Sequence, residues 1–349
     1  MLTKTFAKFL TTIAVLGTTT TAAPFLAPRT DSRHDLLHKT IAQLKDTGTW
    51  FENVISQRNG DLLITMMAPN ASIYRLRNPA SPRPELSLVH TIPDADGLLG
   101  IAETGPDTVV VAGSRFDAPA SPTPGTMAVW EVKVGPESST ARKIVDIPEA
   151  GMLNGVAWVP GRQQATAVLI ADSAQGVIYR VDVATGAYEI VVDAPETKLV
   201  SGSAFEAGAN GAKVRDGYLY WSNSNLVAFY RVEIDAKGYP APGAAIEQVA
   251  TAANAATIVD DFAFDQRGDI WSTTNLDYTL VKVAPGGSAS VVLGGPGQLV
   301  MAGNAAAAFG QTPADKHILY VVTDGALASP VNGTIIEPAK VVAVDTRYS

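Results

Sequence analysis

Short apolar runs recur along this chain, and tight turns separate each run from the next. Residues 62–66, 218–221 and 270–273 each follow a turn that contains Asn-Gly, Asp-Gly or Gly-Asp. Strands joined by such turns are typical of antiparallel hairpins. The same arrangement occurs six times, so the hydrophobic pattern predicts six copies of one unit that is built from strands.

A small or polar residue stands where the first strand of each unit begins, at intervals of about fifty residues. These residues are Glu52, Gly100, Asn154, Asn210, Asp260 and Asn304. A strand-rich repeat of this length predicts an all-β fold, a six-bladed β-propeller of four-stranded blades. Residues at one offset in every blade lie on a ring around the propeller axis, so the same positions form a candidate site.

The N-terminal region and the last strand are expected to complete this architecture. Residues 34–45 place leucines and an isoleucine at helix-like spacing, which predicts a short amphipathic helix before the propeller. Residues 340–344 are expected to pair in the last blade with a strand from the N-terminal region, which closes the ring. The proline-rich segment 115–126 is too long for a hairpin turn and is expected to form a rim loop or lid.

Composition adds a secretion signal to this picture. The chain has 349 residues, of which only 17% are charged, and its 30 Gly and 22 Pro suit strands and turns. Residues 1–23 combine two lysines, an apolar stretch and a small Ala-Ala pair, which is typical of a cleavable signal peptide. We therefore expect a secreted protein whose residues 24–349 form a single propeller domain.

Charge and missing residue types restrict the partners. The net charge of −8 becomes −10 without the two signal lysines, so we expect neither nucleic acid nor membrane as a partner, but small hydrophobic substrates. The chain has no cysteine, which excludes thiol catalysis and thiolate metal ligands. No glycine fingerprint precedes a helix, and we expect no nucleotide, flavin or haem. The sequons at Asn70 and Asn332 are candidate glycosylation sites, and the oligomeric state stays open.

The ring positions carry oxygen ligands. Glutamate, asparagine and aspartate side chains suit Ca²⁺, whereas zinc is disfavoured because no histidine or cysteine belongs to the set. The alternative is that Asn-Gly and Asp-Asp pairs are only turn residues. Turn chemistry does not explain Glu52, which precedes no glycine.

These residues also carry a family resemblance. Residues 154–158, Asn-Gly-Val-Ala-Trp, and 260–265, Asp-Asp-Phe-Ala-Phe-Asp, resemble blade motifs of the gluconolactonase, senescence-marker-protein and paraoxonase superfamily. The resemblance extends from Trp50 to the C-terminus. It implies a propeller with an axial calcium, with one possible ligand missing at Gly100. The implied calcium ligands are Glu52, Asn154, Asn210 and Asp260, and the candidate catalytic residues are Asp260, Asp261, Asn210 and Asn304.

Lactone hydrolysis is one activity that this resemblance implies. It needs a Lewis acid on the carbonyl and a base that activates water. None of the four histidines, His34, His38, His90 and His317, stands at a ring position, so a histidine pair like that of paraoxonase is not expected. A carboxylate from Asp260 or Asp261 could act as the base, and hydrolysis stays open.

A second activity comes from a narrower resemblance. Residues 98–103, 303–310 and 331–334 resemble a fungal branch of the superfamily that includes the hetero-Diels-Alderases of tropolone sesquiterpenoid biosynthesis. This resemblance implies an enzyme that couples a tropolone quinone methide to a humulene-type olefin. Pericyclic chemistry needs neither base nor nucleophile, and it gains from alignment of the partners and from polarisation of a carbonyl.

Candidate pocket walls follow from the large side chains near the inner strands. They are Met66, Phe116, Trp221 and Tyr278, and ordinary core packing is the alternative for each. Trp158 and Trp271 lie within strands and are expected in the core. Three classes of function therefore remain: a hetero-Diels-Alderase, which we favour, a calcium-dependent lactonase, and a non-catalytic binding propeller.

Overall fold

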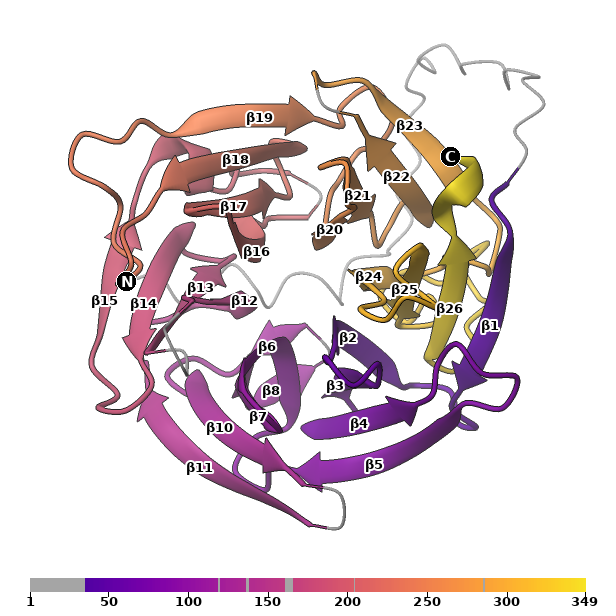
Figure 1. Cartoon of the computed structure of the whole chain (residues 1–349), viewed down its shortest axis with the longest axis horizontal. Coiled ribbons are helices and arrows are strands. Elements are labelled where there is room, and N and C mark those ends of the chain that lie inside the picture. The colour runs from indigo at the N-terminus through magenta and orange to yellow at the C-terminus, as the bar shows by residue number, and fades with distance from the viewer. Residues whose placement is uncertain (1–34, 119, 136–137, 161–165, 204, 285) are drawn as a thin grey trace, which may run out of the picture. The chain divides into compact units, whose positions relative to one another are not determined.

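The computed structural model describes residues 35–118, 120–135, 138–160, 166–203, 205–284 and 286–349. The predicted signal peptide lies outside these residues. The described part forms one compact unit that consists of six four-stranded antiparallel sheets arranged as blades around an axis (Figure 1). The predicted six-bladed all-β propeller is thereby confirmed.

Each of the first five blades is built from strands that are close in sequence. The first blade contains β2 (Trp50–Ser56), β3 (Leu62–Ala68), β4 (Ser72–Arg77) and β5 (Glu85–Thr91), and the second contains β6 (Gly97–Gly105), β7 (Thr108–Ser114), β10 (Ala128–Val134) and β11 (Ser139–Asp146). The third contains β12 (Leu153–Trp158), β13 (Ala167–Asp172), β14 (Val177–Asp182) and β15 (Tyr188–Val192), and the fourth contains β16 (Ala209–Arg215), β17 (Tyr218–Asn223), β18 (Ala228–Glu233) and β19 (Glu247–Thr251). The fifth contains β20 (Phe262–Phe264), β21 (Ile270–Thr273), β22 (Thr279–Val283) and β23 (Ala289–Gly294).

The sixth blade joins the two ends of the chain. It contains β24 (Asn304–Phe309), β25 (Ile318–Thr323) and β26 (Lys340–Asp345), and its outer strand is β1 (His38–Gln43), which lies beside β26 (Figure 1). The predicted closure of the ring is confirmed. The predicted helix over residues 34–45 is wrong within the described residues, because backbone pairing with β26 overrides the local helical pattern.

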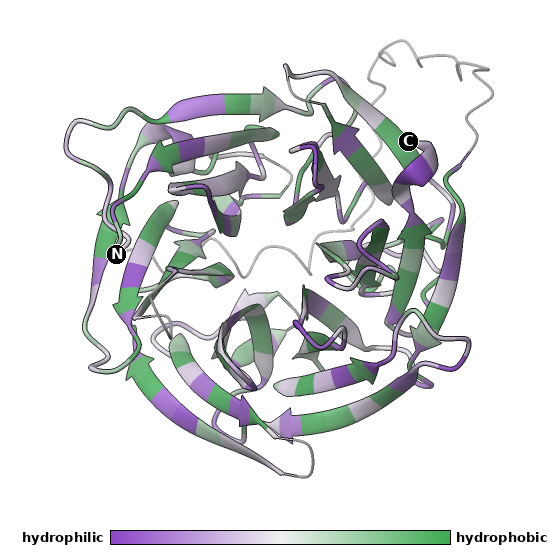
Figure 2. Ribbon diagram, viewed as in Figure 1, coloured by the Kyte–Doolittle hydropathy of each residue, from purple (hydrophilic) through white to green (hydrophobic). Residues whose placement is uncertain are grey.

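Apolar side chains fill the space between neighbouring blades. Six hydrophobic clusters lie at the six interfaces between adjacent blades. In β13, Val168 and Ile170 pack toward the second blade, whereas Leu169 and Ala171 pack toward the fourth. Successive side chains of a strand point to opposite faces, so one apolar strand serves two interfaces. Figure 2 shows bands of apolar and polar residues along the strands.

Buried hydroxyl groups add polar links between blades. The Oγ1 of Thr65 in β3 donates to the carbonyl of Leu99 in the second blade at 2.5 Å. The Ser222 hydroxyl donates to the carbonyl of Asp260 at 2.6 Å, and Thr273 donates to that of Ala305 at 2.8 Å. These bonds satisfy carbonyl groups that are out of reach of water, and they fix the innermost strands relative to one another.

Irregular segments lie outside the blades. The proline-rich segment between β7 and β10 holds a small two-stranded sheet, β8 (Phe116–Ala118) with β9 (Ser121–Pro122). The described part of the chain contains two single-turn helices, η2 (Pro195–Thr197) and η3 (Thr346–Tyr348). Among the described residues, no helix is long and apolar enough to cross a membrane.

Candidate functional site

The innermost strands are irregular at the predicted ring positions. The pairing register shifts between Phe51 and Asn53 in β2, between Leu153 and Val156 in β12, and between Ala209 and Ala212 in β16, and β6 and β24 show the same feature. A bulge bends its strand and redirects a side chain. The side chains of the ring residues therefore depart from the regular in-and-out alternation of a strand. The innermost strands surround a central channel, and we call the end of the channel where these residues lie the ring end.

Glycines let the innermost strands approach each other here. A Cβ on Gly100 would lie 2.1 Å from the carbonyl oxygen of Asn154, and one on Gly155 would lie 2.4 Å from that of Asn210. Both glycines lie within strands, so the turn explanation for Asn154-Gly155 is wrong. Gly100 contributes no polar side chain because the neighbouring backbone occupies the space that one would need.

Three buried carboxyl groups influence one another at the ring end. Burial raises the pKa of Glu52 well above its usual range, and the charge of Asp260 raises it further, against a 2.6 Å hydrogen bond from Trp50 Nε1. Burial raises the pKa of Asp260 to about 7, against hydrogen bonds from Asn275 and Asn210. Asp260 is therefore poised to carry a proton near neutral pH, and the pKa of Glu52 is shifted in the same direction.

The third carboxyl group, Asp324, stands directly after β25. Burial raises its pKa to about 7, against hydrogen bonds from the backbone of residues 326–328, and the charge of Asp260 adds to the increase. A Cβ on Gly303 would lie 1.5 Å from Asp324 Oδ1, so only glycine leaves room for this carboxyl group. Sequence reasoning missed Asp324, although Asp-Gly after an inner strand was a usable signal.

The ring amides differ in what they contact. Asn210 donates through Nδ2 to Ser224 Oγ at 3.0 Å, and its buried Oδ1 has no hydrogen-bond partner. Asn154 is 5% exposed, whereas Asn304 is fully buried and donates to the carbonyl of Thr279 at 2.8 Å. Asn210 and Asn154 are thus candidates to contact a ligand, while the Asn304 side chain supports a loop of the fifth blade.

Asp261 points into a different set of contacts from its neighbour Asp260. Its two carboxylate oxygens each lie 2.8 Å from Lys213 Nζ, and Asn53 Nδ2 donates to Oδ2 at 3.3 Å. Asn53, Asp261 and Lys213 come from the first, fifth and fourth blades, so their bonds link strands on different sides of the channel. We call these three residues the polar bridge.

Apolar side chains gather beside the ring. Trp50, Met67 and Leu99 form a cluster together with the partly buried Phe116, Met152 and Leu327, and we call this group the apolar collar. Of the four predicted walls, Phe116 belongs to the collar. Met66 and Trp221 lie in the cores between blades, and Tyr278 packs in a separate cluster with Ala302 and Val331. Sequence reasoning selected Met66, which faces the core, whereas its neighbour Met67 lies in the collar.

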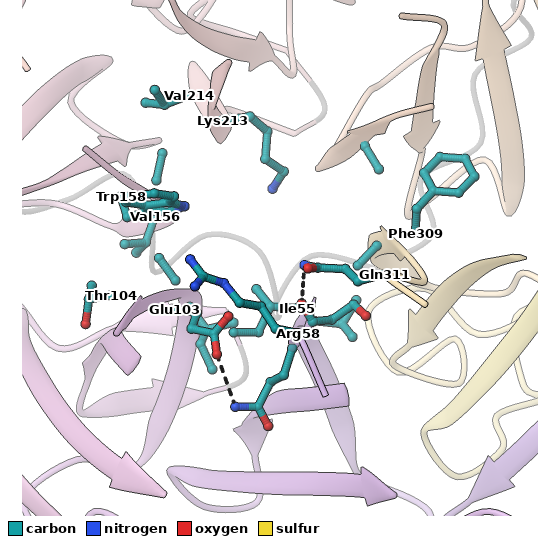
Figure 3. A pocket seen from close by; sticks show the side chains of 18 of the residues that line it. Ile55, Arg58, Glu103, Thr104, Val156, Trp158, Lys213, Val214, Phe309 and Gln311 are labelled. Atoms are coloured by element: carbon teal, nitrogen blue, oxygen red, sulfur yellow. Dashed lines mark hydrogen bonds between the residues drawn. The ribbon is translucent and has the colours of Figure 1, made fainter. Parts of the chain in front are cut away.

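A cavity of about 830 Å³ opens at the other end of the channel, where the innermost strands finish, and we call this the cavity end. All six blades contribute to its lining. Figure 3 shows Trp158 and Phe309 on two sides of it, with Arg58 and Lys213 reaching into it. The expectation that Trp158 is a core residue is wrong, because this side chain is only half-buried and lines the cavity. Trp271 is fully buried as expected.

The described histidines lie away from both ends of the channel. His38 is in β1 and His90 in β5, both outer strands, and His317 directly precedes β25. His90 contacts Ser139 of the next blade at 2.9 Å. His34 lies outside the described residues.

No protein-family model matches the chain, but similar proteins are known. A protein of Sarocladium schorii with the provisional name hetero-Diels-Alderase is 30% identical over 341 residues, which span 89% of this chain and 84% of that protein. A Phoma protein with the same provisional name is 34% identical over 304 residues, which span 78% and 83%. The crystal structure of the calcium-binding protein regucalcin from Agrobacterium tumefaciens aligns with a TM-score of 0.59 at 14% identity, over 90% of this chain and 96% of that one.

The six blades and this structural likeness define the fold, a six-bladed propeller like that of regucalcin. Within that class, the identity to the two fungal proteins is more specific, because it covers more than four-fifths of each of them. The chain belongs to the family of propeller proteins named hetero-Diels-Alderases.

Proposed function

We propose that this protein catalyses a hetero-Diels-Alder cycloaddition at the ring end of the channel. The proposed partners are a tropolone quinone methide as the heterodiene and a humulene-type sesquiterpene as the olefin. One observation carries the proposal: the buried carboxyl and amide groups of the ring lie next to the apolar collar. Hydrogen-bond donors and apolar side chains are therefore neighbours at this end of the channel. Family membership supports the reaction class.

The reaction makes few chemical demands on the protein. Four π electrons of the heterodiene and two of the olefin rearrange into one new C–C bond, one new C–O bond and one new C=C π bond, and no proton or leaving group is released. The protein can accelerate this step by aligning the partners and by donating a hydrogen bond to the carbonyl oxygen of the heterodiene.

The ring end offers suitable groups for both tasks. Burial raises the pKa values of Glu52 and Asp260, which favours the protonated form that can donate to a carbonyl oxygen. The apolar partner would lie against Trp50, Met67 and Phe116 of the collar, where water is scarce. Because the carboxyl groups are fixed by Trp50 and Asn275, they need little reorganisation during the reaction.

The test compares Glu52→Gln with Glu52→Leu. Glutamine keeps a hydrogen-bond donor of the same size, so we expect it to retain most of the steering toward one stereoisomer. Leucine removes the donor and is expected to lower the rate by about 10²–10³. The readout is the product ratio from a quinone methide generated in the presence of humulene. Glu85→Gln on the exposed strand β5 is the control, and a wild-type product ratio equal to that of the protein-free reaction would end the proposal.

A calcium-dependent lactonase is the second candidate, and it rests on a specific observation. The unpartnered Asn210 Oδ1 and the oxygens of Glu52 and Asp260 fit the donor chemistry of calcium. Within the described residues, no three carboxylates, histidines or cysteines converge as a metal site, so Asn154 and Asn210 would have to contribute. A bound calcium ion would supply a Lewis acid for a lactone carbonyl.

The Glu52 variants separate the two candidates. A metal ligand needs a charged carboxylate, so Glu52→Gln should abolish lactone hydrolysis as fully as Glu52→Leu does. In the cycloaddition, by contrast, Glu52→Gln should retain most of the steering and Glu52→Leu should lose rate. Hydrolysis that survives both a chelator and Asp260→Asn would exclude the lactonase.

We further propose that the protein enters the secretory pathway through residues 1–23. Both sequons lie on exposed residues, Asn70 and Asn332, which a glycosyltransferase could reach. Expression in a eukaryotic secretory host should give a mature N-terminus near Pro24 by N-terminal sequencing. Digestion with a peptide N-glycosidase should increase gel mobility, and Asn70→Gln with Asn332→Gln should remove that shift.

A further inference from the structure

We propose that the cavity end is a second binding site, for a hydroxylated aromatic acid. The site is separate from the ring end, and the inference does not depend on the cycloaddition. Its volume of about 830 Å³ is in the range of small-molecule pockets. The lining combines aromatic side chains, a cation that lacks an ion pair, and buried polar atoms that lack partners.

The walls are apolar and only partly covered by protein. Trp158, Val214, Phe264 and Phe309 lie at or next to the ends of the innermost strands of four different blades, and each is partly buried. Large apolar side chains that converge on an open cavity are unfavourable while they face water. Trp158 and Phe309 stand on opposite sides of the cavity (Figure 3), and a flat aromatic ligand could cover either of them and stack on its face.

The cations supply an anion preference. Arg58 is exposed at the rim and forms no ion pair within 4 Å among the described residues. Burial raises the pKa of the nearby Glu103, and the charge of Arg58 opposes this increase. Lys213 Nζ is engaged by Asp261, but its side chain is 28% exposed and one N–H remains for a ligand. Arg58 is therefore the expected partner for a carboxylate, and Lys213 adds to the positive potential.

Two buried polar atoms next to the turn between β2 and β3 lack a hydrogen-bond partner. Gln57 is 2% exposed and donates to Glu103 at 3.4 Å, while its Oε1 has no hydrogen-bond partner. The hydroxyl oxygen of Ser56 is also buried without a partner. Both residues line the cavity. A ligand hydroxyl can donate to such an acceptor, which is why we specify a hydroxylated acid.

Three related probes test the ligand class: 3-hydroxy-2-naphthoate, 2-naphthoate and the neutral 2-naphthalenemethanol. Calorimetric titration measures the affinity of each for the full-length protein. A probe bound in the cavity should also quench tryptophan fluorescence. Because Trp158 is the tryptophan that lines the cavity, Trp158→Phe should remove this quenching. We expect the affinity to fall in the order in which the probes are named. Equal affinities for the neutral and the anionic probes would overturn the proposal.

Two arginine variants test the role of the cation. Arg58→Gln should weaken binding of both naphthoates roughly tenfold and leave the neutral probe unchanged. Arg83→Gln, at an exposed arginine outside the cavity lining, should have no effect. If both variants behave alike, Arg58 does not bind the anion and the inference fails.

A third variant keeps this inference distinct from the proposed function. Glu52→Leu changes the ring end, so it should leave naphthoate binding intact while it removes stereochemical steering. Loss of steering together with retained binding would support two separate sites. Wild-type protein that steers the cycloaddition but does not bind the naphthoates would overturn the cavity site alone.

Discussion

The two ends of the channel are built by the same six strands and differ in almost every property. At the ring end, Glu52, Asp260 and Asp324 are buried, and their pKa values are raised. At the cavity end, about four residues further along each strand, Trp158 and Phe309 face an open volume beside basic side chains. The difference teaches that a propeller can hold two chemically distinct sites on one axis.

Side-chain size produces this contrast. At the ring end, Gly100 and Gly155 leave no side chain between neighbouring strands, so backbones come into contact. At the cavity end, four of the six innermost strands finish with a large residue, namely Trp158, Arg215, Phe264 and Phe309. The polar bridge of Asn53, Asp261 and Lys213 connects the two regions.

The largest effect is expected from breaking the polar bridge. Lys213→Met leaves the Asp261 carboxylate buried without its cation, which should cost about 3–5 kcal/mol of unfolding free energy. The double variant with Asp261→Asn should recover most of the loss, because the buried charge is gone. Urea unfolding measures both. If the double variant is no more stable than Lys213→Met, the bridge does not stabilise the channel as described.

A glycine pair tests the close packing of the ring end. Gly100→Ala would place a methyl group against the Asn154 carbonyl and should cost about 3 kcal/mol. Gly217 has a positive φ of 80° but open space around it, so Gly217→Ala should cost about 1 kcal/mol. The comparison is made by chemical denaturation. Equal losses would contradict tight contact between β6 and β12.

The buried carboxyl groups of the ring end predict a pH dependence to which the cavity end should contribute little. Asp260 and Asp324 have pKa values of about 7 in the folded protein, above their usual values. Raised values favour the fold at low pH, and this stabilisation is lost as the pH rises through 7. The midpoint of thermal unfolding should therefore fall by several degrees between pH 6 and 8.

A pair of matched variants shows which carboxyl group causes this pH dependence. Asp260→Asn should flatten the profile, whereas Glu103→Gln at the cavity end should leave most of it. A profile that is unchanged in Asp260→Asn would mean that other groups titrate. Steering of the cycloaddition should follow the same direction as stability, because the donor form is the protonated one.

The smallest effect is expected at the cavity wall. Trp158→Leu should cost less than about 1.5 kcal/mol, because the side chain already faces water. The control Trp221→Leu removes a fully buried side chain from the core between the third and fourth blades and should cost about 3 kcal/mol. Similar costs for the two variants would place Trp158 in the core after all.

Repetition made most of the fold predictable. Turn chemistry at Asn59-Gly60 or Asp216-Gly217 and alternating strands recur in every blade, so each blade supports the prediction of the others. The N-terminal strand β1 was not predicted because it belongs to no local hairpin. Its conformation is decided by β26, whose partner residues are far away in sequence.

The site was predictable in position but not in detail. A constant offset located Glu52, Asn154 and Asp260, since equivalent residues must face the axis. Whether a wall residue such as Met66 or Met67 faces the channel depends on bulges that shift the register, and the sequence does not mark these. The size of the cavity at Trp158 likewise depends on how far the strands separate.

The pairing of β1 with β26 has a consequence for biogenesis. The outer strand of the last blade is made first, and its partner is made almost 300 residues later. At ribosomal rates, His38–Gln43 waits for roughly 15–60 s before β26 exists. During that time its edge is available to other chains, so the interval before ring closure is when this protein most needs a chaperone.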